Sequence, residues 1–486
     1  MPTADICEFV KMAREELRHP ARLLGMSAFW AWLQIVFSSP YLSPLPFLPV
    51  NLPSQHLVWT MSLFVTMIMF LLVFAGALRA FVLHVRVIAL SSLLMAFGSL
   101  MLAVSSSIDG GITFAVLGTI GVGAGSALAF LRWGLHLALL SPRRVLLDMA
   151  IFALLTALIF GAFGLLPPVA ARFGAVAIPL ASGALLHAAN CEASQYSASV
   201  NDAREDLPRR QERQLLSLAV LVGLVYGIMR GATLSFGAST VGAVTAATVV
   251  GVGAAGVLLL VTAVFYRRES ELYLVCEVSF PLLAAGFLIL PQNTDVGLPL
   301  SMIVFAAGHT YFYFLLWVFC VDRAHVSGRD RLSVFTVGLM AFLGSSLVGS
   351  LVSDALALMG FEDGSFIGIL SLVVVYLFVL AFAVLFRREH MERSRDLRAM
   401  SERHYNEFKR CSLLVAKEGC LTERETEVFQ LLAEGKDRAA IREQLFISND
   451  TVKTHIRRIY SKLDIHAKQE ARSLVERRME QELRGM

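Results

Sequence analysis

The sequence predicts an all-α protein that combines a transmembrane helical bundle with a small helical domain after it. Of its 486 residues, 56% are hydrophobic and only 16% are charged, whereas soluble domains carry about 25% charged residues. Nearly all of the apolar excess lies within residues 24–386. The residues after 420 are rich in charge and space their apolar positions at helical intervals, which predicts the second domain.

The apolar region divides into segments of roughly 20 residues, the length at which a helix crosses the hydrocarbon core. A polar break at residues 190–213 separates six such segments from six more. Twelve spans are expected, at residues 24–41, 57–78, 85–106, 112–132, 145–166, 169–188, 214–235, 240–265, 271–290, 297–320, 332–354 and 365–386.

Positive charge alternates between successive connections of this bundle. Lys and Arg concentrate in cytoplasmic loops. One set of connections carries Arg79, Arg86, Arg143, Arg144, Arg204, Arg209, Arg210, Arg213, Arg267, Arg268, Arg323, Arg329, Arg331, Arg387 and Arg388, and the alternate set carries Asp109, Asp295, Glu362 and Asp363. We therefore expect a multi-pass protein of the inner (cytoplasmic) membrane with both termini in the cytoplasm. Residues 1–23 are polar and mildly basic, and a short amphipathic helix lying on membrane lipid is expected there.

The stretch from residue 421 contains residues typical of the starts and ends of successive short helices. Thr422 and Glu425 stand at the spacing of a capping box. Gly435 occupies the position where a left-handed residue ends a helix. A second helix is expected at 438–445, followed by a turn at Phe446 and Ile447.

A third helix, expected at 449–462 after the N-cap Ser448, is the candidate for reading DNA. Its apolar positions recur at intervals of four, three and four residues and pack inward, at Val452, Ile456, Ile459 and Leu463. Lys453, Thr454 and Arg457 then face outward, where a helix docked in the major groove meets base edges. Thr451, Arg458 and Lys462 are placed for contacts with phosphates, and Ser448 at the start of the helix is also a candidate DNA-binding residue.

The whole stretch resembles the LuxR/FixJ-type DNA-binding domain. L-T-x-R-E, A-E-G, I-x-x-x-L-F-I-S, T-V-K-T-H and K-L stand in this order over about 60 residues at the spacing of that family. The resemblance implies four helices, with the fourth, at about 468–483, making a homodimer contact on double-stranded DNA. It also implies base contacts from Lys453, Thr454 and Arg457. Arg442 is a departure, because the family usually has a small residue after Ile441.

Residues 387–420 are expected to form a linker helix between the bundle and the domain at 421–486. Its apolar stripe follows intervals of three and four residues, at Leu397, Met400, His404, Phe408, Cys411 and Val415. Such a stripe can pair with a second copy of the chain. It can equally lie on its own protein, and the pattern does not choose between the two.

Polar side chains within the spans are candidates for a ligand site, because they are expensive to place in a membrane. Four pairs separated by four residues put a polar group beside an aromatic ring or a histidine on the same helical face: Trp30–Gln34, Arg132–His136, Tyr226–Arg230 and His309–Tyr313. Guanidinium groups and aromatic rings suit a small anionic or aromatic ligand. Two structural readings stay open: Arg132 can reach toward the membrane interface, and Arg230 can pair with a structural carboxylate.

The layout of six spans, a polar break and six more resembles a major-facilitator-type transporter bundle. In that family the first, fourth, seventh and tenth helices line the central cavity, so the resemblance implies that all four pairs share one pocket. The connection from Gly76 to Arg86 lacks the acidic residue and second glycine of the family's loop signature, which weakens the case for transport.

The sequence contains no motif that indicates a metal site or an enzyme. The six cysteines are scattered without a C-x-x-C pair, at 7, 191, 276, 320, 411 and 420. No phosphate-binding loop, nucleophile elbow or zinc-protease motif appears, and we expect neither an enzyme nor a cofactor. The sequence favours a membrane-bound one-component transcription regulator, whose bundle at 24–386 senses an unknown small molecule. The alternatives are an active transporter with a regulatory DNA-binding tail, and a bundle that serves only as an anchor.

Overall fold

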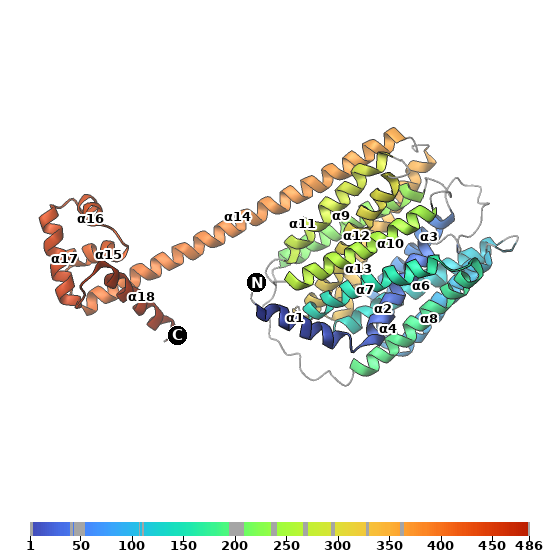
Figure 1. The fold of residues 1–486 in the computed structure, drawn as a ribbon, viewed down its shortest axis with the longest axis horizontal. Helices are drawn as coiled ribbons and strands as arrows, with labels where there is room; N and C mark the ends of the chain where they lie inside the picture. The colour runs from blue at the N-terminus through green and yellow to red at the C-terminus, as the bar shows by residue number, and fades with distance from the viewer. Residues whose placement is uncertain are drawn as a thin grey trace. The chain divides into compact units, whose positions relative to one another are not determined.

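The computed structural model describes residues 3–38, 42, 54–105, 107–108, 111–193, 209–234, 241–265, 271–292, 297–326, 330–359 and 364–484. The described residues form helices and turns without a β-strand, as the sequence predicts (Figure 1). The chain divides into two compact units, residues 1–382 and 383–486.

The first unit begins with α1 (Thr3–Glu16) and contains one long helix for each predicted span. These are α2 (Pro20–Ser38), α3 (Ser54–Phe74), α5 (Arg86–Ser105), α6 (Ile112–Leu137), α7 (Pro142–Gly164), α8 (Pro168–Ala193), α9 (Arg209–Leu234), α10 (Val241–Phe265), α11 (Glu271–Ile289), α12 (Gly297–Val326), α13 (Arg331–Leu358) and the start of α14 (Gly364–Glu418). A short α4 (Arg79–Leu83) connects α3 to α5, and a 3-10 turn, η4 (Leu290–Gln292), follows α11.

Length and apolarity alone qualify nine helices among the described residues to cross a membrane. Two further apolar stretches, Glu277–Ile289 of α11 and Gly368–Ala381 of α14, are shorter. The remaining long helix, α2, corresponds to the first predicted span and carries Arg22 and Gln34 among its apolar residues. The predicted series of apolar helices is therefore present, and most boundaries lie within a few residues of those expected. The exception is the end of the last span, because α14 continues without a break from the span expected at 365–386 through the expected linker helix to Glu418.

Helices that are distant in the sequence pack closely in this bundle. The most extensive contacts join α9 with α13, α5 with α6, α7 with α10, α11 with α12, and α2 with α8. At the crossing of α9 and α13, a Cβ on Gly227 would overlap the carbonyl oxygen of Ser346, and one on Gly349 would overlap that of Leu224. Two glycines thus allow the backbones of these helices to touch, which fixes the position of α9 in the bundle.

Ion pairs attach the N-terminal segment to the bundle. Arg22 on α2 pairs with Glu16 at the end of α1, and its Nε lies 2.9 Å from a carboxylate oxygen of Asp148 on α7. Arg144 on α7 lies 3.0 Å from Glu15. The predicted helix near the N-terminus is therefore present as α1. Its predicted contact with membrane lipid stays a prediction.

The second unit contains the end of α14 and four further helices, α15 (Glu423–Ala433), α16 (Arg438–Leu445), α17 (Asn449–Leu463) and α18 (Lys468–Arg484). One apolar core joins them. Cys411 and Val415 of α14 are buried in this core, and Phe408 packs against it. The second half of the predicted linker stripe therefore lies on its own domain. The side chains of Leu397, Met400 and His404 lie outside the described residues.

Candidate DNA interface and membrane pocket

The start of α17 is fixed by a local hydrogen-bond network. The Ser448 hydroxyl oxygen accepts a hydrogen bond from the backbone N–H of Thr451 at 3.1 Å, and the two hydroxyls lie 2.7 Å apart. Phe446 ends α16 with a φ of 56° and starts the turn that the sequence predicts. The two helices are thus set by local sequence, as the N-cap and turn residues indicated.

The outward face of α17 carries the predicted DNA contacts. Val452, Ile456 and Ile459 are buried, whereas the side chains of the opposite face are exposed: Lys453, Thr454, Arg457 and Arg458. The Lys453 ammonium lies 3.6 Å from the Asp450 carboxylate, and the Thr454 hydroxyl donates to the Asp450 carbonyl at 2.8 Å. This face therefore presents three positive side chains and one hydroxyl on a rigid helix. That arrangement suits contacts with bases and phosphates.

Lys462 has a different environment from the one predicted. Its ammonium donates to the Glu425 carboxylate at 2.7 Å and to the Cys420 carbonyl at 3.0 Å. The Glu425 side chain also accepts from the backbone N–H of Thr422, which completes the predicted capping box. Lys462 therefore joins the end of α17 to the start of α15, and we leave it out of the proposed DNA contacts.

Hydrogen bonds to Glu425 stabilise its ionised carboxylate. The bond from Lys462 and the bond from the Thr422 backbone lower the pKa of its carboxyl from 4.5 to about 2. Sequence reasoning recognised the capping box but missed its partner across the domain. Glu425 and Lys462 are 37 positions apart in the sequence, and nothing in the sequence signalled that the two meet.

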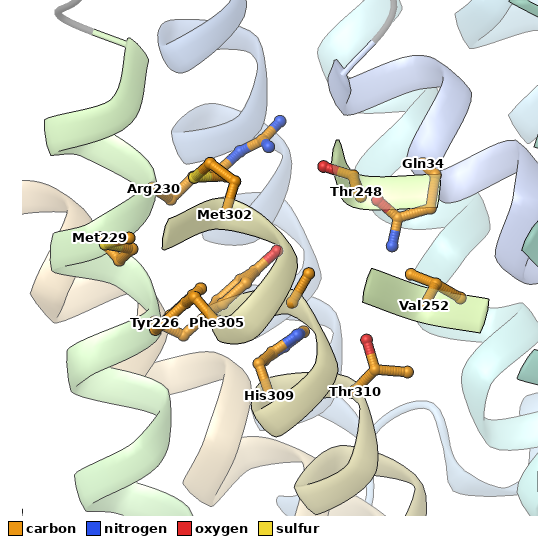
Figure 2. A pocket seen from close by; sticks show the side chains of 11 residues that line it. Gln34, Tyr226, Met229, Arg230, Thr248, Val252, Met302, Phe305, His309 and Thr310 are labelled. Atoms are coloured by element: carbon orange, nitrogen blue, oxygen red, sulfur yellow. The ribbon is translucent and has the colours of Figure 1, made fainter. Parts of the chain in front are cut away.

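A small pocket of about 30 Å³ lies inside the membrane bundle. Figure 2 shows Tyr226, Phe305 and His309 on one side of it, and Gln34 and Val252 on the other. The complete lining is Gln34 from α2, Tyr226, Met229 and Arg230 from α9, Thr248 and Val252 from α10, and Met302, Phe305, Ala306, His309 and Thr310 from α12. Three of the four helices that the resemblance implied therefore meet here, joined by α10.

Aromatic stacking and a bridging arginine shape this pocket. The rings of Tyr226 and His309 lie nearly parallel with centroids 3.9 Å apart, and the Phe305 ring is nearly parallel to both, with centroid distances of 6.2 Å to Tyr226 and 6.3 Å to His309. The buried guanidinium of Arg230 donates to the carbonyl oxygen of Phe37 on α2. Arg230 thus bridges the two sets of six helices, and it lines the pocket together with Gln34.

Arg132 and His136, which the resemblance implied would share this pocket, lie outside its lining. The Arg132 guanidinium donates to the carbonyls of Val82 at 3.4 Å and Leu83 at 3.2 Å, at the end of α4. His136 Nδ1 lies 3.2 Å from the side-chain oxygen of Asn190 on α8. The spacing of the pair correctly placed both on one face of α6. It could not say which neighbour that face would meet.

Trp30 and Tyr313 lie beside the pocket without lining it. Their rings meet edge to face with centroids 5.2 Å apart, and Tyr313 stacks on His309 at 6.1 Å. They form an aromatic layer that supports the His309 ring. Thr248 and Phe305 were missed by sequence reasoning. A threonine and a phenylalanine in an apolar span are too common to stand out.

Comparison with known proteins connects this geometry with a family. The description "Bacterial regulatory proteins, luxR family" matches residues 420–475, which include α15, α16 and α17. The C-terminal domain is a LuxR-type DNA-binding domain. Over 51 residues the chain is 53% identical to the transcriptional regulatory protein LiaR of Bacillus subtilis (strain 168). The match covers 10% of this chain and about a quarter of LiaR, 24%, so it describes the LuxR-type domain alone.

The bundle is similar to solved transporters. The human organic anion transporter MFSD10 (TETRAN) matches with a TM-score of 0.53 and 15% identity, over 76% of this chain and 99% of the transporter. A bacterial homologue of the iron transporter ferroportin, in an outward-facing state, matches with a TM-score of 0.50 and 13% identity, over 76% and 97%. At these identities the likeness shows the fold. The chain is a multi-pass membrane protein that joins a bundle with the fold of these transporters to a LuxR-type domain.

Proposed function

We propose that this protein is a membrane-bound one-component transcription regulator. A small molecule bound in the pocket of Figure 2 controls sequence-specific DNA binding by the LuxR-type domain. The observation that supports this proposal is that one chain contains both a pocket with polar lining residues within a bundle and a helix face with exposed cationic side chains. Both termini lie in the cytoplasm, where α17 reaches the DNA.

The DNA-contacting surface consists of Lys453, Thr454 and Arg457 toward base edges, and Arg458 with Thr451 toward phosphates. All five are exposed on one side of α17. The buried row of Val452, Ile456 and Ile459 keeps that side outward. The domain acts as a homodimer on double-stranded DNA. Its two reading helices then meet half-sites one helical turn apart.

The ligand is a small anionic or aromatic molecule. Arg230 supplies positive charge, Gln34, Thr248 and Thr310 supply hydrogen-bonding groups, and the ring of Phe305 supplies an apolar face. A hollow of about 30 Å³ holds little more than one water-sized group. The ligand therefore binds a conformation in which α2, α9, α10 and α12 stand further apart. A ligand shifts an equilibrium by its difference in affinity between two states.

The experiment uses purified full-length protein and a panel of small aliphatic and aromatic carboxylates. Compounds that raise the thermal unfolding midpoint are then added to a binding assay with DNA selected from a random pool. At least one compound should change the DNA affinity of the full-length protein, and Arg230→Gln should abolish both effects. DNA affinity that no stabilising compound changes would reduce the bundle to an anchor.

Transport is the second candidate, because the bundle has the fold of solved transporters. Uptake of the same carboxylate into proteoliposomes separates the two functions. A regulator binds the compound without accumulating it inside the vesicles. Accumulation driven by a proton gradient would favour a transporter with a regulatory tail.

A further inference from the structure

A second hollow lies in the membrane bundle, at the end where α9 and α13 begin and α12 ends. Its volume is about 200 Å³, and it shares no lining residue with the pocket of Figure 2. Leu216 on α9 and Phe319 on α12 line it, and each is ten residues from a lining residue of that pocket, Tyr226 or His309. At 1.5 Å per residue the two hollows lie roughly 15 Å apart along these helices.

The lining of this second hollow is divided between apolar and charged groups. Most of it is apolar and comes from Phe74, Leu216, Leu316, Phe319, Val334 and Val337. Glu212, Arg323 and Ser333 supply the polar part. The buried Arg323 guanidinium lies 3.3 Å from the Glu212 carboxylate. Its lining is therefore amphipathic, with an ion pair among apolar side chains.

The polar part continues to a second ion pair at the surface of the bundle. The backbone N–H and the hydroxyl of Ser333 donate to the Asp330 carboxylate at 3.1 and 3.2 Å. That carboxylate lies 2.7 Å from the guanidinium of Arg79, whose side chain is 46% exposed. Two arginines and two carboxylates therefore lie along this end, and their charges balance.

The apolar part also reaches the outside of the bundle. Phe74 lines the hollow and is nevertheless 63% exposed, and Leu71, one turn earlier on α3, is exposed as well. In a bundle that spans a membrane, exposed apolar side chains of this kind face acyl chains. The hollow is thus open at Phe74 to the lipid phase.

We propose that this second hollow binds one acyl chain of a zwitterionic phospholipid whose headgroup carries a primary ammonium. The chain enters past Phe74, the phosphate meets Arg79 and Arg323, and the ammonium donates to Asp330 and Glu212. Guanidinium groups pair with phosphate oxygens through two parallel hydrogen bonds. A balanced pair of each sign complements a headgroup that itself carries one charge of each sign.

The site also joins the two sets of six helices. Phe74 and Arg79 belong to the first set, and Arg323, Asp330 and the remaining lining belong to the second. A lipid held there contacts both sets at once. Its occupancy therefore depends on how the two sets are positioned relative to one another.

The test uses full-length protein in nanodiscs that contain phosphatidylethanolamine with a photoactivatable diazirine in one acyl chain. After irradiation, mass spectrometry should locate the cross-link on residues 316–338. Val337→Phe, which fills the hollow, should reduce that cross-link at least fivefold. Val348→Phe is the matched control on α13, because Val348 is exposed on the bundle surface, and it should leave the cross-link unchanged.

Headgroup recognition is tested by competition in the same nanodiscs. Unlabelled phosphatidylethanolamine should displace the probe several-fold better than phosphatidylcholine, which lacks ammonium N–H donors, or phosphatidylglycerol, which lacks the ammonium. Asp330→Asn should remove the preference over phosphatidylcholine, and Arg79→Gln should weaken retention of all three lipids. Should Val337→Phe fail to fold, as judged by gel filtration and DNA binding, Val334→Met adds a smaller obstruction.

Two results would overturn the proposal. One is a cross-link spread evenly over the lipid-facing surface and insensitive to Val337→Phe and Val334→Met. The other is equal or better competition by phosphatidylcholine or phosphatidylglycerol.

Discussion

The DNA-reading face and the pocket in the bundle are built in opposite ways. On α17, the side chains that we propose contact DNA are exposed. Their positions depend on a cap, a turn and a row of buried residues, all within about one helix of sequence. In the bundle, Gln34, Tyr226, Thr248 and His309 come from four helices and line one hollow, where Thr248 is buried and the other three are half-buried. A surface made locally tolerates changes elsewhere, whereas a pocket made from distant segments responds to any shift of a helix.

The largest effect is expected where a helix position depends on backbone contact. Gly227→Ala puts a methyl group against the carbonyl of Ser346 and forces α9 away from α13. Tyr226 and Arg230 move with α9, because both belong to that helix. Overpacking of this kind costs about 1–3 kcal/mol. A lower thermal unfolding midpoint of the full-length protein, together with loss of ligand response, checks the expectation.

Gly253→Ala is the matched control for this experiment, because its new Cβ lies 3.7 Å from Ala157, an ordinary contact. It should leave the midpoint unchanged or raise it, since alanine favours a helix over glycine by roughly 0.5–1 kcal/mol. Equal stability of the two variants would show that the α9–α13 crossing is loose.

The next largest effect is expected on the stability of the LuxR-type domain. Glu425→Gln removes the charge that Lys462 and the Thr422 N–H stabilise, which should cost about 1.5–3 kcal/mol. Because folding lowers the pKa of Glu425 from 4.5 to about 2, its contribution is complete above pH 4.5 and is lost as the pH falls toward 2. Hydrogen exchange of residues 421–463 in the full-length protein should show this loss.

Glu427→Gln serves as the comparison for Glu425→Gln, since Glu427 pairs with Arg424 on the surface with about half of its side chain exposed, 49%. Surface pairs contribute little. Similar exchange rates in the two variants would contradict the special role assigned to Glu425.

Substitutions on the outward face of α17 should distinguish side chains that contact bases from those that contact phosphates. Lys453→Ala and Arg457→Ala should each cost about 1–3 kcal/mol of discrimination at one base position. Arg458→Ala should weaken binding to all sequences alike and reduce its salt dependence. Titration of selected and scrambled DNA at several salt concentrations measures both. An unaltered sequence preference in Lys453→Ala would move the reading face elsewhere on α17.

The smallest effect on signalling is expected at Arg132. Its guanidinium binds the carbonyls that end α4, away from the pocket lining. Arg132→Gln should therefore keep the ligand response within about twofold of the wild type in a reporter assay, a change worth roughly 0.4 kcal/mol. Abolition of the response, matched by normal expression, would restore Arg132 to the site.

The sequence by itself determined the elements whose causes are local. Thr422 with Glu425, Gly435 and Ser448 set helix ends through hydrogen bonds spanning a few residues, and the structure shows each of them. The apolar spans follow from the same logic, because a membrane requires about 20 apolar residues in each helix. For these features, residue type and spacing are the physical cause.

Tertiary structure decided which faces meet. Nothing in the spacing of Arg132 and His136 distinguishes a helix face against α4 and α8 from one against the pocket. Lys462 reads as an exposed cation until α17 packs beside α15 and brings Glu425 within 2.7 Å. Thr248 reaches the pocket because α10 packs on α12. Such contacts depend on the rotation and separation of helices that are far apart in the chain. Close backbone approaches, such as that of Gly227 to Ser346, set this rotation and separation, and local periodicity does not encode them.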